Sequence, residues 1–311
     1  MMPIAPTIAV HPLQRAERDA CAELLNRRLL DSAYSLPMDA KTLDEQLFLP
    51  DPPTVFDVRW SKRLVLGAWR AGEMIGVLDA ATGHHSGNLD LPEFEPEGLL
   101  RFLVFGERDD LVNDTFRALM DRAHTFWREE HVRQVTAFHI STGYPLFQAG
   151  AGVMPSDWSN VLRMLTGENW MFSERYYALV RSLGGALEEE TPLADLSLVQ
   201  QRTTNGRHYQ LYHRRVDWIG RARMIGMTLD RADTVERVAH LVDLEVSELW
   251  RNRNIGKWLL RRLLNDATQQ GFQEMLVYLP VSAAIAMNLF LQHGFHELNY
   301  RGYTFEKELG N

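Results

Sequence analysis

The sequence predicts an α/β protein built from two similar domains, and three observations support this prediction. The chain has 311 residues, which is enough for two domains of ordinary size. Its composition, 45% hydrophobic and 24% charged, is that of a globular protein. Segments with the periodicity of strands alternate with segments that have helical periodicity, and part of this order occurs twice along the chain.

The first half begins with two predicted helices. Residues 12–30 carry apolar side chains on one helical face, and Pro12 is favourable in a first helical turn. Residues 39–48 predict a second helix, for which Asp39 is a suitable N-cap. Prolines at positions 50, 52 and 53 then end this helix.

The rest of the first half alternates between strands and helices. Residues 62–80 predict a hairpin with its turn at Arg70–Glu73, and the Gly- and Pro-rich segment 82–98 predicts a loop. There follow, in order, a strand at 99–105, a helix at 111–130, a strand at 132–140, a helix at 156–165 and a strand at 171–180.

A flexible linker is predicted after residue 183, because a Gly-Gly pair and an acidic run ending in Pro192 follow it. We therefore expect a first domain at 1–183, a linker at 184–195 and a second domain at 196–311. The second domain starts directly with strands at 196–202 and 208–214, joined by a tight turn.

The clearest motif is a strand, a polar turn and a helix between His240 and Gly271. Residues 240–249 are largely apolar, as in a buried strand, and apolar residues recur at helical spacing from Ile255 to the stop at Gly271. The turn and the helix concentrate positive charge in a chain whose formal net charge is -8. The cations are Arg251, Arg253, Lys257, Arg261 and Arg262, and no acidic residue lies among them.

This turn has the features of an anion-binding site. Free backbone N–H groups at a helix start and the positive end of the helix dipole attract anions, and Gly256 permits close approach to the backbone. The alternative is a solvated basic helix face. We favour a diphosphate site because the strand, the turn and the glycine agree with it.

Residues Arg251–Gly256 resemble the Arg/Gln-x-x-Gly-x-Gly/Ala loop by which the GNAT (Gcn5-related N-acetyltransferase) superfamily holds the pyrophosphate of coenzyme A. The resemblance continues to the helix that ends in LFLQHGF and covers most of residues 207–309. Asn254 replaces the first glycine, but Asn adopts a left-handed backbone more readily than most residues. The resemblance implies two tandem domains, each with a mixed, mostly antiparallel sheet flanked by helices.

The resemblance also implies an acetyl-CoA site in the second domain. The main chain before the turn would pair with pantetheine, the turn and helix start would hold the diphosphate, and Phe290 would pack near the cofactor. The implied residues are Leu244, Glu245, Val246, Arg251, Asn252, Arg253, Asn254, Ile255, Gly256, Lys257 and Phe290. The two helices that the family places between its first strands have no room here. The missing wall would come from the first domain or from a second subunit of a homodimer.

The first domain is expected to be a degenerate copy. The hairpin pattern of Arg70–Gly76 recurs at Arg214–Gly220, and Arg108 then corresponds to Arg251 at nearly the same offset. Asp109 and Asp110 follow Arg108, so two carboxylates would face a diphosphate there. We expect this domain to have lost cofactor binding.

Catalysis by the family implies a base on the strand before the turn, at the position of His240. An imidazole is a suitable base near neutral pH, and the alternative is a structural histidine at a strand end. Strand alternation places Asp243 and Glu245 on the opposite face. Phe290 stands where the family commonly has a tyrosine acid, so water, Tyr300 or Tyr303 would replace it, unless the tyrosines are structural.

Composition excludes several other classes. Cys21 is the only cysteine, so an internal disulfide and a thiolate zinc cluster are excluded, and no other metal site is expected. We see neither a secretory signal nor an apolar run that would span a bilayer, which indicates a cytoplasmic protein. The acidic composition, with a sequence pI of about 5.8, argues against nucleic acid as a partner.

Three functions fit these observations. The first is acetyl transfer from acetyl-CoA to the amine of a small molecule or peptide, by direct attack on the thioester. The second is a non-catalytic acyl-CoA-binding or regulatory protein, which Phe290 and the degenerate first domain would favour. The third is an interaction scaffold without a ligand.

Overall fold

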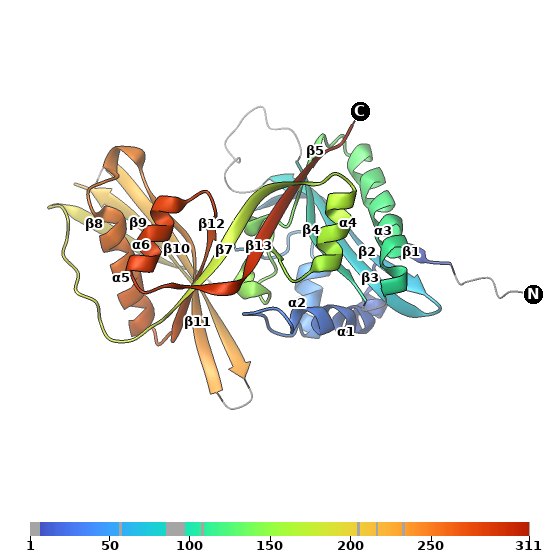
Figure 1. The fold of residues 1–311 in the computed structure, drawn as a ribbon, viewed down its shortest axis with the longest axis horizontal. Helices are drawn as coiled ribbons and strands as arrows, with labels where there is room; N and C mark the ends of the chain where they lie inside the picture. The colour runs from blue at the N-terminus through green and yellow to red at the C-terminus, as the bar shows by residue number, and fades with distance from the viewer. Residues whose placement is uncertain are drawn as a thin grey trace, which may run out of the picture. The chain divides into compact units, whose positions relative to one another are not determined.

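The computed structural model describes residues 7–55, 58–84, 97–106, 109–203, 206–215, 217–231 and 234–310. The chain forms two compact units (Figure 1). Unit 1 comprises Met1–Arg175 and Gly302–Asn311, and unit 2 comprises Tyr176–Arg301. Each unit is an α/β structure with a mostly antiparallel sheet, as the sequence predicts.

The sheet of unit 1 is antiparallel except at one pair of strands. Its order is β1 (Ala9–Pro12), β2 (Arg59–Arg70), β3 (Glu73–His84), β4 (Glu97–Phe105) and β5 (Gln134–Ala137). Strands β4 and β5 are parallel, and they pair only over Gly98–Leu100. The C-terminal part of β13 (His296–Glu308) pairs with β5 and with the short β6 (Met154–Pro155).

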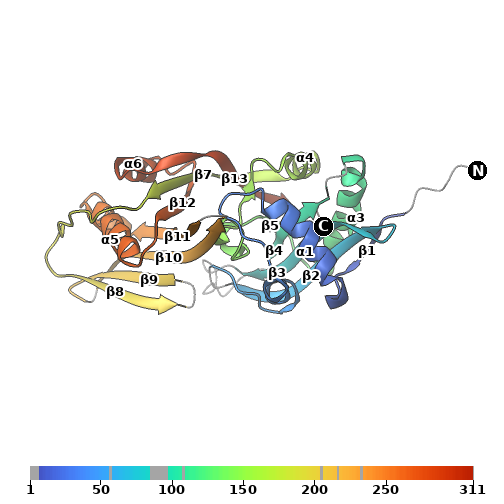
Figure 2. The same cartoon turned by 90° about the horizontal axis from the view of Figure 1, so that it is seen from below.

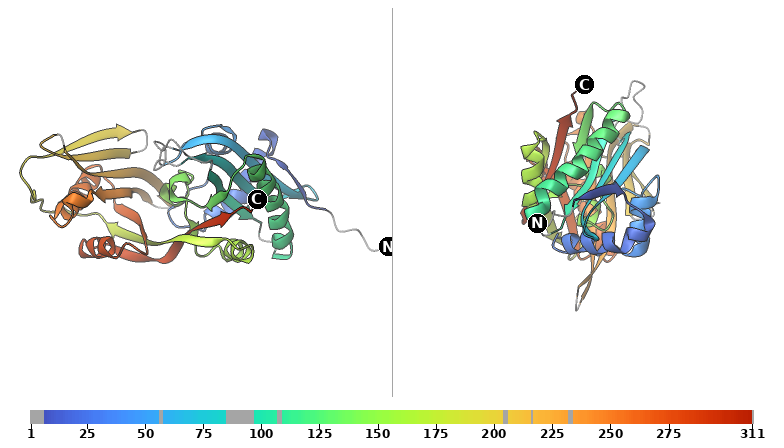
Figure 3. Two further views of the ribbon diagram at one scale, coloured as in Figure 1. Left: turned by 90° about the horizontal axis from the view of Figure 1, so that it is seen from above. Right: turned by 90° about the vertical axis from the view of Figure 1, so that its right-hand side faces the viewer.

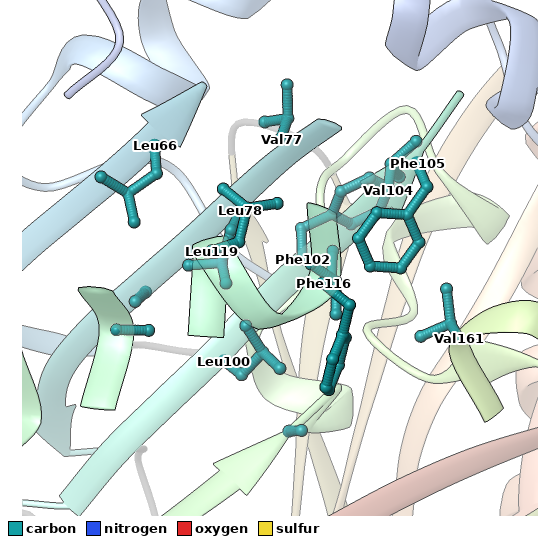
Figure 4. Close-up of a cluster of buried hydrophobic side chains, with 14 of the residues drawn as sticks. Leu66, Val77, Leu78, Leu100, Phe102, Val104, Phe105, Phe116, Leu119 and Val161 are labelled. Atoms are coloured by element: carbon teal, nitrogen blue, oxygen red, sulfur yellow. The ribbon is translucent and has the colours of Figure 1, made fainter. Parts of the chain in front are cut away.

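Four helices complete unit 1: α1 (Arg18–Leu29), α2 (Ala40–Leu43), α3 (Asp109–Glu129) and α4 (Ser159–Gly167). Helices α1 and α3 both pack on the sheet, from opposite sides (Figure 3). Apolar side chains from the sheet, α3 and α4 form the buried core that Figure 4 shows. The amphipathic period of α3 therefore finds its apolar partner in β3 and β4.

The sheet of unit 2 begins with the last residues of β7 (Met171–Ser182), which pair with β12 (Glu274–Pro280). Its order continues with β11 (Thr234–Val246), β10 (Asp217–Arg231), β9 (Gly206–His213) and β8 (Leu196–Thr203) (Figure 2). Only β11 and β12 are parallel. Residues 183–195 contain no helix, so β8 follows the linker directly.

Two helices of unit 2, α5 (Ile255–Gln269) and α6 (Ala284–Gln292), share one hydrophobic core on one face of this sheet. That face presents Ala239 and Leu241 from β11 and Met275 and Val277 from β12. Since side chains alternate along a strand, His240 and Tyr278 lie on the other face.

Most predicted elements are present, and the differences have local causes. The helix predicted from residue 12 starts only at Arg18, because Pro12 ends a strand and a short 3-10 helix follows. The loop predicted at 82–98 lies mostly outside the described residues, and β3 and β4 extend into its two ends. Strand β1 was missed because it is four residues long and ends in a proline, yet it pairs with β2 over Ala9↔Trp69. The predicted strand 132–140 shortens to β5 because Phe138 has a positive φ of 57° and the chain then enters a short 3-10 helix. Asp39 caps its helix as expected, accepting a hydrogen bond from Thr42 N at 2.8 Å.

The two repeated sequence patterns are hairpin turns at the same place in both units. The first joins β2 to β3 with positive φ at Ala71 (51°) and Gly72 (84°). The second joins β9 to β10 with positive φ at Arg214 (49°) and Arg215 (62°). This shared geometry supports a duplication of one ancestral unit.

Candidate functional site

The candidate site of unit 2 lies where β11 leaves its parallel neighbour. Strand β11 pairs with β10 along its whole length, but with β12 only over Val238–His240. From Leu241 to Val246, its other edge therefore pairs with no strand in the described part of the chain. A strand edge of this kind offers backbone hydrogen-bonding groups to an extended ligand. Leu244, Glu245 and Val246, whose main chain the resemblance assigns to pantetheine, lie on this segment.

A bulge at Val242 changes which side chains face which way. Asp243 is the partner of Arg223 and Leu241 is the partner of Met224, so Val242 has no partner on β10. Cross-strand partners share a face, which puts Asp243 on the same face as His240, the partner of Ile225.

The expectation that Asp243 and Glu245 lie opposite His240 was therefore wrong. It assumed unbroken alternation, and the bulge removes one step. The ion pairs of Arg221 with Asp243 (2.9 Å) and with Glu245 (3.0 Å) are consistent with a shared face. Burial is the main cause that raises the pKa of the Asp243 carboxyl above its usual range, against the lowering effect of Arg221.

The loop that follows β11, residues 247–254, sets the start of α5. A single 3-10 turn (Glu248–Trp250) precedes Arg251, and α5 starts at Ile255. Asn252 and Asn254 have positive φ angles of 62° and 60°. The predicted left-handed backbone at Asn254 is confirmed, and Asn is among the non-glycine residues that tolerate it best.

The start of α5 carries a cluster of unused hydrogen-bond donors. Trp258 N donates to Asn254 O at 3.0 Å and is the first N–H bonded in the helical pattern. Within the described part of the chain, the backbone N–H groups of residues 252–257 donate to no protein acceptor. Such donors, together with the helix dipole, are suited to a phosphate.

The structure gives no packing reason for a glycine at position 256. Its φ is not in the left-handed region, and a Cβ there would meet Leu289 Cδ2 and Val246 Cγ2 at 3.8 Å, an ordinary contact. Glycine in a helix costs about 0.5–1 kcal/mol relative to alanine. Neither backbone conformation nor packing therefore explains the glycine at position 256. Close approach of a ligand to this backbone would explain it.

The five cations divide into two groups. Arg251 bonds to Val246 O (3.1 Å) and to Glu248 (3.3 Å), and Arg253 lies 4.9 Å from the ring centre of Trp250. Lys257 is exposed and forms no ion pair among the described residues. Arg261 and Arg262 instead contact the linker, at Glu188 O (3.1 Å) and Glu189 (3.7 Å). Three cations thus remain at the start of α5.

His240 is buried and lies beside Tyr278, which in turn contacts Tyr300. Its ring makes an edge contact with Tyr278, with the ring centres 5.6 Å apart. The Tyr278 hydroxyl lies 2.5 Å from that of Tyr300. Tyr278 is the cross-strand partner of Ala178 on β7. Sequence reasoning missed Tyr278 because nothing in the strand pattern marks it.

Two other predicted site residues have clear structural positions. Phe290 is 3% exposed and packs edge-on against Phe295, so it belongs to the core beneath α6. Tyr303 belongs to unit 1, where its ring packs against Phe172 and Phe305. The contacts within unit 2 therefore do not include Tyr303.

Unit 1 repeats the strand geometry of the site with different chemistry. Strand β4 has a bulge at Arg101, because Phe102 is the partner of Asp79 and Leu100 is the partner of Ala80. Pairing with β5 ends at Leu100, as pairing of β11 with β12 ends at His240. Arg108 lies outside the described residues, as do the side chains of Asp109 and Asp110.

A buried polar network surrounds this bulge. Arg101, fully buried, donates to Thr142 O (2.7 Å) and to Gln46 Oε1 (2.6 Å). Asp79 accepts from Arg63 (2.9 Å) and from the Tyr144 hydroxyl (2.8 Å), and it lies 3.4 Å from Arg101. Burial lowers the pKa of the Arg101 guanidinium and raises that of the Tyr144 hydroxyl. The bulge of unit 1 is thus occupied by side chains that satisfy one another.

Membrane-spanning helices and metal sites are two further features that bear on function. Among the described residues, no helix is long and apolar enough to cross a membrane. No group of three His, Cys, Asp or Glu side chains there is arranged to hold a metal ion.

Part of this chain is similar to a known protein family. Residues 176–295 match the model of the acetyltransferase (GNAT) family. A search of curated proteins by sequence gave no match.

Three solved structures share the fold across the chain. A tandem GNAT protein from the clavulanic acid biosynthesis pathway has a TM-score of 0.62 at 15% identity, over 98% of this chain and 99% of that one. A GCN5-related N-acetyltransferase from Sphaerobacter thermophilus has a TM-score of 0.60 at 10% identity, over 97% and 95%.

The third has a GCN5-related glucosamine N-acetyltransferase region within a fungal multi-domain GH3 β-N-acetylglucosaminidase. Its TM-score is 0.69 at 13% identity, over 98% of this chain, which spans only 38% of that protein. At such identities the likeness is one of fold.

The network in unit 1 makes a prediction about stability. Asp79→Asn should lower the free energy of unfolding by about 3–5 kcal/mol, because it leaves buried Arg101 and Arg63 without their counter-charge. Urea unfolding followed by circular dichroism measures the change. The control is Asp19→Asn, whose side chain is 95% exposed and which should have little effect. Equal, small effects of both substitutions would contradict the structural role of Asp79.

Proposed function

We propose that unit 2 transfers an acetyl group from acetyl-CoA to an amine, because residues 176–295 match the model of the acetyltransferase (GNAT) family and the chain shares the fold of a tandem GNAT protein. The observation that carries this proposal is the start of α5. There, six consecutive backbone N–H groups have no protein acceptor among the described residues, and they surround a glycine that packing does not require. Arg251, Arg253 and Lys257 add positive charge to the same loop.

The residues present fit the two parts of coenzyme A. The donors of residues 252–257 would hold the diphosphate, and the open edge of β11 from Leu241 to Val246 would pair with the amides of pantetheine. When bound, acetyl-CoA supplies the activated thioester. Phe290 would not touch the reacting atoms, since it is buried in the core.

The polar face of unit 2 would receive the amine. Asp243 and Glu245 flank Arg221 on the face that carries His240. Carboxylates attract an ammonium group, so a cationic small molecule or a peptide amine is the expected acceptor. His240 would accept the proton that the amine must lose before attack.

A hydroxyl pair near His240 would relay the proton that this base takes from the amine. Tyr278 contacts His240 and shares a hydrogen bond with Tyr300, which is partly exposed. A phenolic hydroxyl both donates and accepts, so the pair is able to carry a proton between His240 and solvent. The sulfur leaving group, whose ordinary thiol pKa is about 8.5, needs little further assistance.

A second candidate, non-catalytic binding of acyl-CoA, is favoured by one observation. Phe290 places an apolar ring where the family commonly has a hydroxyl. Release of free CoA with a panel of amines separates the candidates, because a binding protein would retain acetyl-CoA without turnover. Failure to bind acetyl-CoA at about 1 mM would reject both.

The loop assignment predicts the effect of a side chain at position 256. Gly256→Val should weaken acetyl-CoA binding at least about 100-fold, because the branched side chain occupies the space of the diphosphate. Isothermal titration calorimetry measures the affinity. Thermal unfolding should change little, since a Cβ at this position makes only ordinary contacts.

The matched control for this substitution is in the other unit. Arg108→Ala, at the sequence position that corresponds to Arg251, should leave the affinity for acetyl-CoA unchanged. An unaltered affinity of Gly256→Val would show that the α5 loop is not the diphosphate site.

The proposed base predicts a characteristic pH profile. His240→Ala should lower kcat by about 10²–10⁴-fold at neutral pH, and the deficit should shrink as rising pH deprotonates the amine without help. Glu245→Asn, on the same face but 41% exposed, should raise KM for a cationic amine and leave the shape of the kcat profile unchanged. Parallel profiles of wild type and His240→Ala at all pH values would remove His240 from the role of base.

A further inference from the structure

Two adjoining cavities in unit 1 have no part in the proposed acetyl transfer. The first lies between α1, the end of β4 and the start of α4, with a cavity volume of about 50 Å³. The second lies between β3, the end of β4 and α3, with a cavity volume of about 130 Å³. Leu24, Arg27, Phe105 and Gly106 line both, so the cavities meet at the end of β4. Figure 4 shows Phe105 and Val161, which line the first.

The walls of these cavities combine apolar and polar side chains. Val104, Phe105 and Val161 contribute to the first, and Met74, Ile75, Leu111 and Val112 contribute to the second. A lining of this mixed kind suits a ligand that has both an apolar chain and polar ends.

Gly106 keeps the junction of the two cavities open. Its φ is not in the left-handed region. A Cβ at this position would approach nothing closer than Ile75 O at 3.7 Å. Neither backbone conformation nor packing therefore requires glycine here, and a side chain would project into the space that the cavities share.

One polar group at each end lacks a conventional partner among the described residues. The half-buried guanidinium of Arg28 lines the first cavity, lies 5.6 Å from the ring centre of Trp158, and forms no ion pair. Arg27, by contrast, is paired with Glu23 at 2.8 Å. Thr115 lines the second cavity, is 1% exposed, and its hydroxyl has no hydrogen-bond partner. A buried hydroxyl without a partner is costly, and a ligand atom would relieve that cost.

We propose that these cavities bind a small amphiphilic carboxylic acid, with its carboxylate at Arg28, its apolar chain over Gly106 and a polar end at Thr115. A guanidinium is the side chain best suited to a carboxylate, because its planar N–H groups match the two oxygens. Unit 1 would then bind a ligand other than the cofactor, because its sequence lacks the glycine that the diphosphate loop needs.

The nearby carboxylate of Asp31 defines two sources of such a ligand. Asp31 lines the first cavity and pairs with neither Arg27 nor Arg28. A simple acid would be repelled by Asp31, whereas an α-amino acid would place its ammonium group there. Both kinds of ligand combine a carboxylate with an apolar chain. Asp31→Asn distinguishes the simple acid from the amino acid, because it should tighten binding of hexanoate but weaken binding of norleucine.

The test uses the full chain with hexanoate, hexanamide and ω-hydroxyhexanoate as calorimetric probes. Hexanoate should bind with a Kd of about 1 mM or tighter, and hexanamide at least about tenfold more weakly. ω-Hydroxyhexanoate should bind roughly fivefold tighter than hexanoate to the wild type, and equally tightly to Thr115→Val.

Two substitutions decide whether these cavities are responsible. Arg28→Met and Gly106→Val should each weaken hexanoate binding at least about tenfold. Gly106→Ala is the second variant if Gly106→Val does not fold. Acetyl-CoA should not compete. No saturation by hexanoate at about 10 mM, equal binding of hexanamide, or binding that both substitutions leave intact would overturn the proposal.

Discussion

The candidate site depends on the point at which β11 and β12 stop pairing. Parallel hydrogen bonds hold the two strands together only up to His240, after which β11 continues with β10 alone. This separation leaves one backbone edge of β11 open and directs the chain into the loop before α5. The two asparagines with positive φ then turn the chain so that α5 begins with its N–H groups exposed. Strand edge and helix start are thus consequences of one interruption in the sheet.

The same interruption occurs in unit 1, where different side chains surround it. Both strands carry a bulge near the interruption, at Val242 in unit 2 and at Arg101 in unit 1. Val242, at the bulge of unit 2, has an apolar side chain, and His240 and the carboxylates occupy the polar face. Arg101, at the bulge of unit 1, instead forms hydrogen bonds in the network around Asp79. One backbone therefore supports an open site in one unit and a closed, stabilising cluster in the other.

The cavities of unit 1 lie beyond this network, at the end of β4. The network occupies the bulge, but the end of β4 and its junction with α3 are left with space around Gly106.

The sequence predicted the features that local chemistry controls. Asp39 caps its helix, Asn254 adopts a left-handed backbone, and α5 begins at Ile255, because each depends on the residue itself and its near neighbours. The position of Asp243 relative to His240 was not predictable, since a bulge leaves no mark in an apolar strand. The partnership of Tyr278 with Tyr300 arises from strand order, and the burial of Phe290 arises from tertiary packing.

Amide hydrogen exchange of the whole chain, with and without acetyl-CoA, tests the central claim most directly. The N–H groups of residues 252–257 donate to no protein acceptor among the described residues. If the start of α5 receives the diphosphate, these groups should become protected from exchange when acetyl-CoA is added. Residues 109–113, at the start of α3, should exchange as before. Protection at 109–113 with none at 252–257, or no change in either segment, would contradict the assignment of the cofactor to unit 2.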